Sequence, residues 1–219
     1  MFSNDYTLSK GKLVMVLECW DEVRGKWIMY ARAEDHTADC ERYPLEQIPT
    51  HVFLDTSVLN LIIKYAPVIF EMEPQNPGTP LNRARDIEAL MHIFAVGTRA
   101  NWTLRASSKT LEEVNRTPCE NTRNALASYA VEMLESTEVS QHGDDHGRWL
   151  ADSSRLVALP DKSDRELLGN AIELGCSAFI TADVRTIVSK RDRLPQLPLR
   201  ILTPTEWWSH VKPWGGLWL

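Results

Sequence analysis

The fold is decided by one stretch of the sequence, Ser163-Asp-Arg-Glu-Leu-Leu-Gly-Asn-Ala-Ile-Glu-Leu-Gly175-Cys-Ser-Ala-Phe-Ile-Thr181-Ala-Asp183. In its first half the apolar residues recur with the spacing of an amphipathic helix that begins at Ser163, and Gly175 is suited to end that helix. In its second half, residues 178–181 form a short apolar run typical of a buried strand. A helix followed at once by a buried strand is typical of an α/β fold with a parallel sheet.

The same alternation of strands and helices extends in both directions from this stretch. Residues 52–54 predict a strand, and residues 56–66 predict a helix that stops at Pro67, because proline lacks an amide hydrogen and disfavours a helical residue before it. We expect residues 141–147 to form a loop because of their polar, glycine-containing composition. The remaining expected elements are helices over 87–97, from Thr110 and from Asn121, and strands over 102–105 and 199–202, the last followed by a short helix.

The N-terminal region differs from this pattern. Two apolar runs, residues 13–17 and 26–30, flank a turn and predict a β-hairpin. Residues 33–50 are polar, contain two prolines and are expected to be turn-rich. The sequence thus predicts an N-terminal β-hairpin appendage over residues 1–47 and an α/β domain over residues 48–219.

Composition and charge restrict the class of protein. A chain of 219 residues with 43% hydrophobic composition can bury one full core and is short for two independent domains. The formal net charge of −6 argues against a general basic surface, so any RNA contact must be local. The four cysteines include no CxxC pair, which indicates neither a zinc site nor a disulfide framework. Because the sequence shows neither a signal peptide nor a membrane-spanning stretch, we expect a cytoplasmic protein.

Four carboxylates fall where a parallel sheet binds its ligands, beyond the carboxyl ends of the strands. Asp55 and Asp183 each follow a predicted strand, while Glu113 and Asp164 lie in the first turns of two predicted helices. Each also has an ordinary structural explanation. Asp55 is suited to cap the next helix, and both Thr110-Leu-Glu-Glu113 and Ser163-Asp-Arg-Glu166 match a capping box.

Taken together, the four acids favour a metal site, because carboxylates gathered in one crevice repel each other unless a cation neutralises them. Oxygen ligands without Cys or His suit Mg²⁺ or Mn²⁺. Such an ion polarises a phosphoryl oxygen and activates a water, which is the chemistry of phosphodiester hydrolysis. Ser57 and Thr181, near the same strand ends, are candidates to position a water or a ligand, or are ordinary capping residues.

Three motifs resemble those of the PIN-domain nucleases, a family that includes bacterial toxin ribonucleases: His51-Val-Phe-Leu-Asp55-Thr-Ser, Thr110-Leu-Glu-Glu113-Val, and the stretch from Ser163 to Asp183. The resemblance covers about residues 50–211 and implies a three-layer sandwich with a central parallel sheet. It also implies an endoribonuclease whose metal-binding cluster consists of Asp55, Glu113, Asp164 and Asp183. The leading subtype is the toxin of a toxin–antitoxin pair, with RNA, an antitoxin protein and a second copy of the chain as partners.

The match leaves two ligand positions open. Glu112 neighbours Glu113, and Asp161 lies close to Asp164, so each pair offers an alternative ligand, although the motifs favour Glu113 and Asp164. A further acid that many relatives carry just beyond the last aspartate is missing, since residues 184–188 contain none. Two ions at such a site could clamp the attacking and the leaving oxygen, and the missing acid argues against tight binding of the second ion.

Basic and aromatic residues supply candidates for contacts with RNA, although surface charges are usually only solvated. The tryptophans near the C-terminus, Trp207, Trp208, Trp214 and Trp218, are better suited to core or partner packing than to base stacking. The polar cluster in residues 142–146 is a weaker candidate for a metal or substrate site. The candidates for phosphate contacts are Arg148, Arg155, Lys162, Arg165, Lys190, Arg191 and Arg193.

Two functions other than a nuclease are alternatives. A catalytically inactive PIN-like scaffold would bind RNA or protein without cutting, but a scaffold has no reason to accept the repulsion of four clustered acids. A phosphatase resembling the haloacid dehalogenases would use Asp55 as its nucleophile, but that family has an acid two positions later, where this chain has Ser57.

Overall fold

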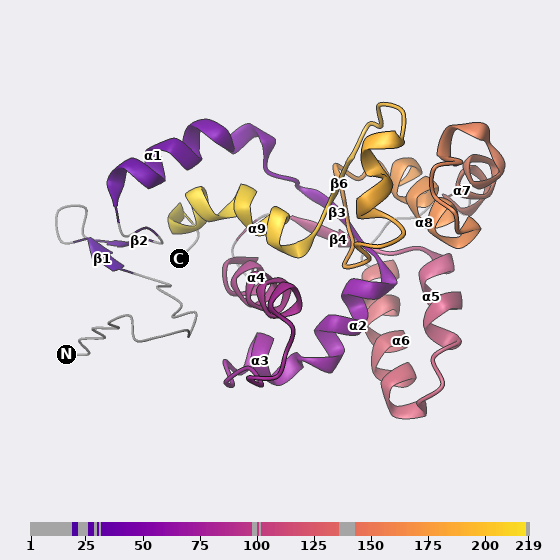
Figure 1. The fold of residues 1–219 in the computed structure, drawn as a ribbon. Coiled ribbons are helices and arrows are strands. Elements are labelled where there is room, and N and C mark those ends of the chain that lie inside the picture. The colour runs from indigo at the N-terminus through magenta and orange to yellow at the C-terminus, as the bar shows by residue number, and fades with distance from the viewer. Residues whose placement is uncertain are drawn as a thin grey trace. The chain divides into compact units, whose positions relative to one another are not determined.

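The chain divides into two compact units, and the larger one contains the central sheet (Figure 1). The computed structural model describes residues 19–21, 26–28, 30, 32–97, 100, 102–135 and 143–217. The larger unit is formed by Pro49–Trp208, and the smaller one by Met1–Ile48 together with Ser209–Leu219.

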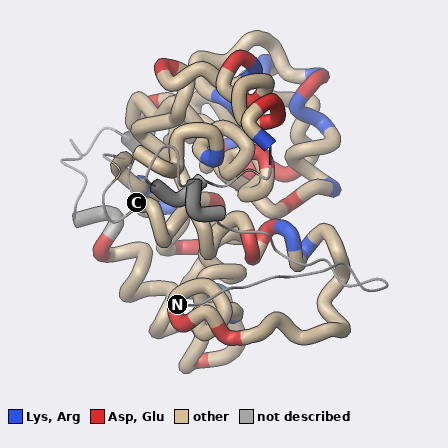
Figure 2. The backbone as a smooth tube through the Cα atoms, turned by 90° about the vertical axis from the view of Figure 1, so that its left-hand side faces the viewer, with Lys and Arg blue, Asp and Glu red and all other residues tan. Residues whose placement is uncertain are grey.

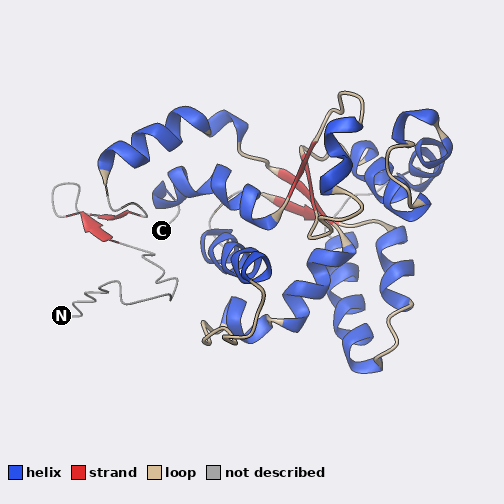
Figure 3. Cartoon of the chain, in the orientation of Figure 1, coloured by secondary structure: helices blue, strands red, loops and turns tan. Residues whose placement is uncertain are grey.

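Four parallel strands form the sheet of the larger unit, in the order β4-β3-β5-β6 (Figure 3). The central strands are β3 (His51–Leu54) and β5 (Ala178–Ile180), and the edge strands are β4 (Thr103–Arg105) and β6 (Arg200–Leu202). The central strands are almost continuously apolar because a parallel sheet is covered on both faces. The α/β fold with a central parallel sheet, predicted from the sequence, is confirmed.

Helices connect these strands close to the expected positions. The helix predicted over residues 56–66 ends earlier, at Lys64. Pro67 lies in the first turn of a further helix, where proline is tolerated because a backbone amide at that position has no acceptor within the helix. Within the described residues, no helix is both long and apolar enough to cross a membrane. The helices after β3 are α2 (Thr56–Lys64), α3 (Ala66–Phe70), α4 (Leu81–Gly97), α5 (Ser108–Asn115), α6 (Glu120–Glu135), α7 (Gly143–Asp152), α8 (Lys162–Glu173) and α9 (Pro204–Val211), with the 3₁₀ helices η2 (Ser154–Leu156) and η3 (Val188–Arg193).

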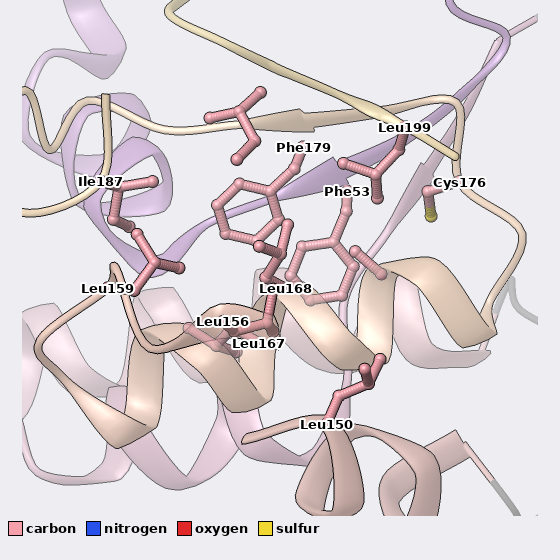
Figure 4. Close-up of a cluster of buried hydrophobic side chains, with 12 residues drawn as sticks. Phe53, Leu150, Leu156, Leu159, Leu167, Leu168, Cys176, Phe179, Ile187 and Leu199 are labelled. Carbon is pink, nitrogen blue, oxygen red and sulfur yellow. The ribbon is translucent and has the colours of Figure 1, made fainter. Parts of the chain in front are cut away.

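One face of the sheet packs on helix α8 through a cluster of buried side chains (Figure 4). The rings of Phe53 and Phe179, opposite each other in β3 and β5, are stacked with their centroids 5.5 Å apart. Leu167 and Leu168 of α8 are buried in the same cluster. Alternate strand residues such as Leu54 point the opposite way and are also completely buried, so both faces of the sheet are covered.

Helices α7 and α8 lie side by side because two glycines allow their backbones to approach closely (Figure 1). A Cβ atom on Gly169 would lie 2.7 Å from the Cα of Gly147, and a Cβ atom on Gly147 would lie 1.6 Å from Oδ1 of Asn170. The prediction of a loop over residues 141–147 is wrong from Gly143 onward, where α7 begins. Gly147 serves the packing of two helices, and not a turn.

In the smaller unit, β1 (Cys19–Asp21) pairs with β2 (Lys26–Ile28), and helix α1 (Ala33–Arg42) follows. The strand expected over residues 13–17 lies outside the described residues. The expectation of turns over residues 33–50 is wrong for α1, which buries no side chain and lacks the apolar periodicity on which helix prediction depends. Acids in its first turn and a basic residue in its last turn instead complement the helix dipole.

The C-terminal residues from Ser209 belong to this smaller unit, although the sequence predicts one domain over residues 48–219. In the 3₁₀ helix η4 (Lys212–Leu217), the indole N–H of Trp214 donates to the carbonyl of Tyr43 at 2.7 Å. Because this bond joins residues 171 positions apart, no local sequence pattern predicts it.

We expect the substitution Gly147→Ala to destabilise the protein. Alanine normally favours a helix over glycine by about 1 kcal/mol, but here the new Cβ would collide with Asn170, which is completely buried and donates to Ser107. Overpacking of this kind costs about 1–3 kcal/mol. Urea unfolding measures the change, with Gly78→Ala in an exposed loop as the control of small effect. A Gly147→Ala protein at least as stable as the wild type would contradict the close helix contact.

Candidate functional site

The carboxyl ends of β3 and β5 bring two of the predicted acids to the same edge of the sheet. Asp55 directly follows β3, and its amide donates to the carbonyl of Ile180 at the end of β5 (2.9 Å). Asp183 follows β5 after two intervening residues. Since the two central strands are parallel neighbours, the segments that follow them start at the same edge.

Two hydroxyl groups hold the side chain of Asp55, which is only 4% exposed. Ser57 Oγ and Thr181 Oγ1 both donate to its Oδ2, at 2.5 and 2.7 Å. Ser57 Oγ in turn accepts from the amide of Ala182 (2.9 Å), which ties the loop after β5 to the start of α2. The side chain of Asp55 makes no capping bond to α2, so the two supporting residues singled out in the sequence, and not a helix cap, account for its orientation.

Glu113 of α5 is held in the same way, by hydroxyls from two other helices. Thr56 Oγ1 donates to its Oε2 (2.6 Å), and Ser163 Oγ donates to its Oε1 (2.5 Å). Its neighbour Glu112 is exposed and pairs with Lys109 (3.2 Å). Of the two adjacent acids, it is Glu113 whose carboxylate lies between α2 and α8.

The capping boxes predicted for Thr110–Glu113 and Ser163–Glu166 are wrong, although Asp164 does lie in the first turn of α8, where an acid complements the helix dipole. Helix α5 has a capping box formed by Ser107 and Thr110, one turn before Glu113. Helix α8 is capped by Asp161, whose Oδ1 accepts from a backbone amide of the first turn (2.8 Å). Asp161 therefore serves as the helix cap, and Asp164 is the acid of that pair which remains a candidate ligand.

Asp164 and Asp183 meet at the hydroxyl of Thr186, which is not among the site residues predicted from the sequence. Thr186 Oγ1 lies 2.6 Å from Oδ2 of Asp183 and 3.1 Å from Oδ2 of Asp164. The amide of Thr186 donates to the other carboxylate oxygen of Asp183 (2.8 Å). A hydroxyl residue three positions after an aspartate is a pattern typical of a local turn, and this was the signal available in the sequence.

The acids of this network influence each other's charge. Burial raises the pKa of Asp55, and the nearby charge of Glu113 adds to the rise, while the hydroxyls of Ser57 and Thr181 oppose it. Burial and then the charge of Asp55 raise the pKa of Asp164 to about 7. Without a cation, these carboxyl groups therefore resist losing their protons together.

The donor atoms of the network are oxygens from carboxylates and hydroxyls, which suit Mg²⁺ or Mn²⁺. In the part of the chain that the structure describes, no three Asp, Glu, His or Cys side chains already lie close enough together to hold an ion. Hydroxyl groups are bonded to the acids instead. The donor chemistry thus fits a hard cation, and the described acids would have to move closer together to bind one.

Several of the basic residues predicted to contact phosphate are engaged within the protein. Basic and acidic positions are interleaved along the backbone (Figure 2), which makes such pairing frequent. Among the described residues, the candidates whose side chains have no ion-pair or hydrogen-bond partner are Arg155, Lys190 and Arg193. The engaged candidates are Arg191 with Glu206 (2.6 and 2.7 Å), Arg148 with Glu166, Lys162 with Asp152, and Arg165 with the carbonyl of Leu159.

Two of the four C-terminal tryptophans serve packing in the larger unit. Trp207 is completely buried and meets Trp102 edge-on at 5.8 Å between ring centroids. Trp208 stacks on His92 at 4.9 Å. Trp214 belongs to the smaller unit, and Trp218 and the side chains of residues 142–146 lie outside what the structure describes.

No protein-family model matches the chain, and no curated protein or solved structure shows significant similarity to it. The function is therefore inferred from the residues and geometry of the site itself.

We expect the metal-free protein to lose stability as the pH rises from about 4, the usual pKa of aspartate, through about 7, the raised pKa of Asp164. The folded state holds this proton more tightly than the unfolded chain, so the carboxyl group favours folding while it is protonated and loses that effect when it ionises. Thermal unfolding in EDTA over this pH range measures the slope. Asp164→Asn should flatten it.

The exposed acid Asp152 provides the control for this measurement, since Asp152→Asn leaves the acidic network intact. An Asp164→Asn protein with the same pH dependence as the wild type would contradict the raised pKa.

Proposed function

We propose that this protein is a metal-dependent endoribonuclease of the PIN type, with helices in layers on both faces of its parallel sheet. One observation carries the proposal: acids from four separate segments, after β3, in α5, in α8 and after β5, are each held by hydroxyl groups at the carboxyl edge of the sheet. Thr186 links two of them directly, and the charge of Glu113 acts on Asp55. Clustered acids with raised pKa values are typical of functional sites. The toxin of a toxin–antitoxin pair is the subtype that the sequence motifs favour.

Asp55, Glu113, Asp164 and Asp183 would hold the ion, which when bound polarises a phosphoryl oxygen and lowers the pKa of an attacking water. Asp55 is the most deeply buried of the four, and two hydroxyls hold its Oδ2. Since cations favour ionised carboxylates, binding would release the protons that burial keeps on Asp55 and Asp164. Metal affinity would therefore increase as the pH rises through about 7.

The RNA backbone would be bound by few, local contacts, because the chain has a net charge of −6. Arg155, Lys190 and Arg193 are the candidates for these contacts. Each phosphate that they neutralise would add to the salt dependence of RNA binding.

An inactive scaffold is the second candidate function, and one observation favours it: among the described residues, the acids do not already form a ligand set for a metal. The phosphatase alternative is disfavoured. A nucleophilic aspartate must reach its substrate, whereas Asp55 is buried and its Oδ2 accepts two hydroxyl hydrogen bonds.

We expect the purified protein to cleave RNA with Mg²⁺ or Mn²⁺, and EDTA to abolish the cleavage. Asp55→Asn and Asp183→Asn each remove one negative charge at nearly constant size. They should slow cleavage at least about 100-fold, because a bound metal contributes several kcal/mol to transition-state stabilisation. Gel electrophoresis of labelled single-stranded and structured RNA measures the rates.

Glu113→Gln and Glu112→Gln form a matched pair for the same assay. Glu113 is bonded to Thr56 and Ser163, whereas Glu112 is exposed, so only the first substitution should slow cleavage. Cleavage that survives EDTA, or equal effects of the two substitutions, would contradict the metal-site assignment. RNA binding without cleavage would favour the scaffold, and preferential hydrolysis of a small phosphomonoester would favour the phosphatase.

A further inference from the structure

The contacts of Thr186 differ from those of the other hydroxyl residues in the network. Its Oγ1 lies between two of the acids, 2.6 Å from Asp183 and 3.1 Å from Asp164, and its amide donates to the remaining oxygen of Asp183 at 2.8 Å. Both oxygens of the Asp183 carboxylate are therefore held by one residue. Of the described hydroxyl groups, Thr186 is the one that bonds directly to side chains of two of the four acids.

A hydroxyl carries a single hydrogen, so it cannot donate fully to two carboxylates at once. The shorter distance identifies Asp183 as the main acceptor, and Asp164 lies at the longer distance on the same oxygen. In this arrangement the carboxyl groups of Asp164 and Asp183 lie side by side, and the Oδ2 atom of each faces the Thr186 hydroxyl. Of the two donors of Thr186, only the hydroxyl contacts both acids, because the backbone amide donates to Asp183 only.

We infer that Thr186 is a positioning residue of the proposed metal site, whose hydroxyl sets the separation and orientation of the Asp164 and Asp183 carboxylates for the ion. The inference rests on the proposed function. Thr186 would act through the two aspartates and would not itself contact the RNA.

The substitution Thr186→Val isolates this role. Valine has almost the same shape and keeps the backbone amide that donates to Asp183, so only the hydroxyl is lost. Thr186→Ser keeps the hydroxyl and removes a methyl group. Thr205→Val is the matched control, because Thr205 Oγ1 donates to the buried Asp86 (2.7 Å) elsewhere in the larger unit.

The test is calorimetric titration of the four full-length proteins with Mn²⁺, beside RNA cleavage at saturating Mn²⁺. Loss of a residue that orients metal ligands typically weakens metal binding about 10- to 100-fold. We expect that increase in the Mn²⁺ dissociation constant for Thr186→Val, an affinity close to wild type for Thr186→Ser, and no change for Thr205→Val. If Thr186→Val does not fold, Thr186→Ala makes the same comparison.

The outcomes separate this inference from the proposed function. RNA cleavage by the wild type with unchanged Mn²⁺ affinity in Thr186→Val would overturn the role of Thr186 alone. Mn²⁺ binding that depends on the Thr186 hydroxyl, without RNA cleavage, would support that role and reject the nuclease. A wild-type protein that binds no Mn²⁺, or a Thr205→Val protein weakened as much as Thr186→Val, would also overturn the inference.

Discussion

The pairing of β3 with β5 is the constraint on which the rest of the larger unit depends. Its register sets Phe53 opposite Phe179, and the two stacked rings form the centre of the core against α8. The same register brings Asp55 to the hydroxyl of Thr181, 126 positions away in the chain. A shift of β5 by one residue would turn Phe179 to the other face of the sheet, away from Phe53, and separate Asp55 from Thr181.

Hydroxyl groups offset part of the free-energy cost of burying these acids close together. A buried carboxylate loses its hydration, and neighbouring carboxylates repel each other. Hydroxyls from α2, from the start of α8 and from the segment after β5 supply donors without adding positive charge, so the network keeps its negative potential for a cation. Glu166, only two residues after Asp164, shows the contrast: Lys109 and Arg148 pair with it, as expected of a structural acid.

Local sequence patterns predicted the secondary structure and the placement of site residues correctly where one physical effect dominated. The apolar run around Phe179 predicted a buried strand, and the positions of Asp55 and Asp183 after strands predicted their shared edge of the sheet. Prediction failed where packing overrode composition. Gly147 suggested a loop, but it lies within helix α7, and glycine is needed there because α8 leaves no room for a side chain. Arg191 was a candidate for RNA contact, but its planar guanidinium is matched to Glu206 by two hydrogen bonds.

The sequence by itself determined the alternation of strands and helices and the four acids, because apolar periodicity and strand ends are local properties of the chain. Only the tertiary structure decided between Glu113 and Glu112, because adjacent residues on a helix point in different directions and only packing shows which one faces the site. It also decided between Asp164 and Asp161, because it shows that Asp161 caps α8 while Asp164 bonds to Thr186. It alone showed Thr186 between two carboxylates. That contact joins α8 to the loop after β5, and no local pattern records a distance between segments that the sheet brings together.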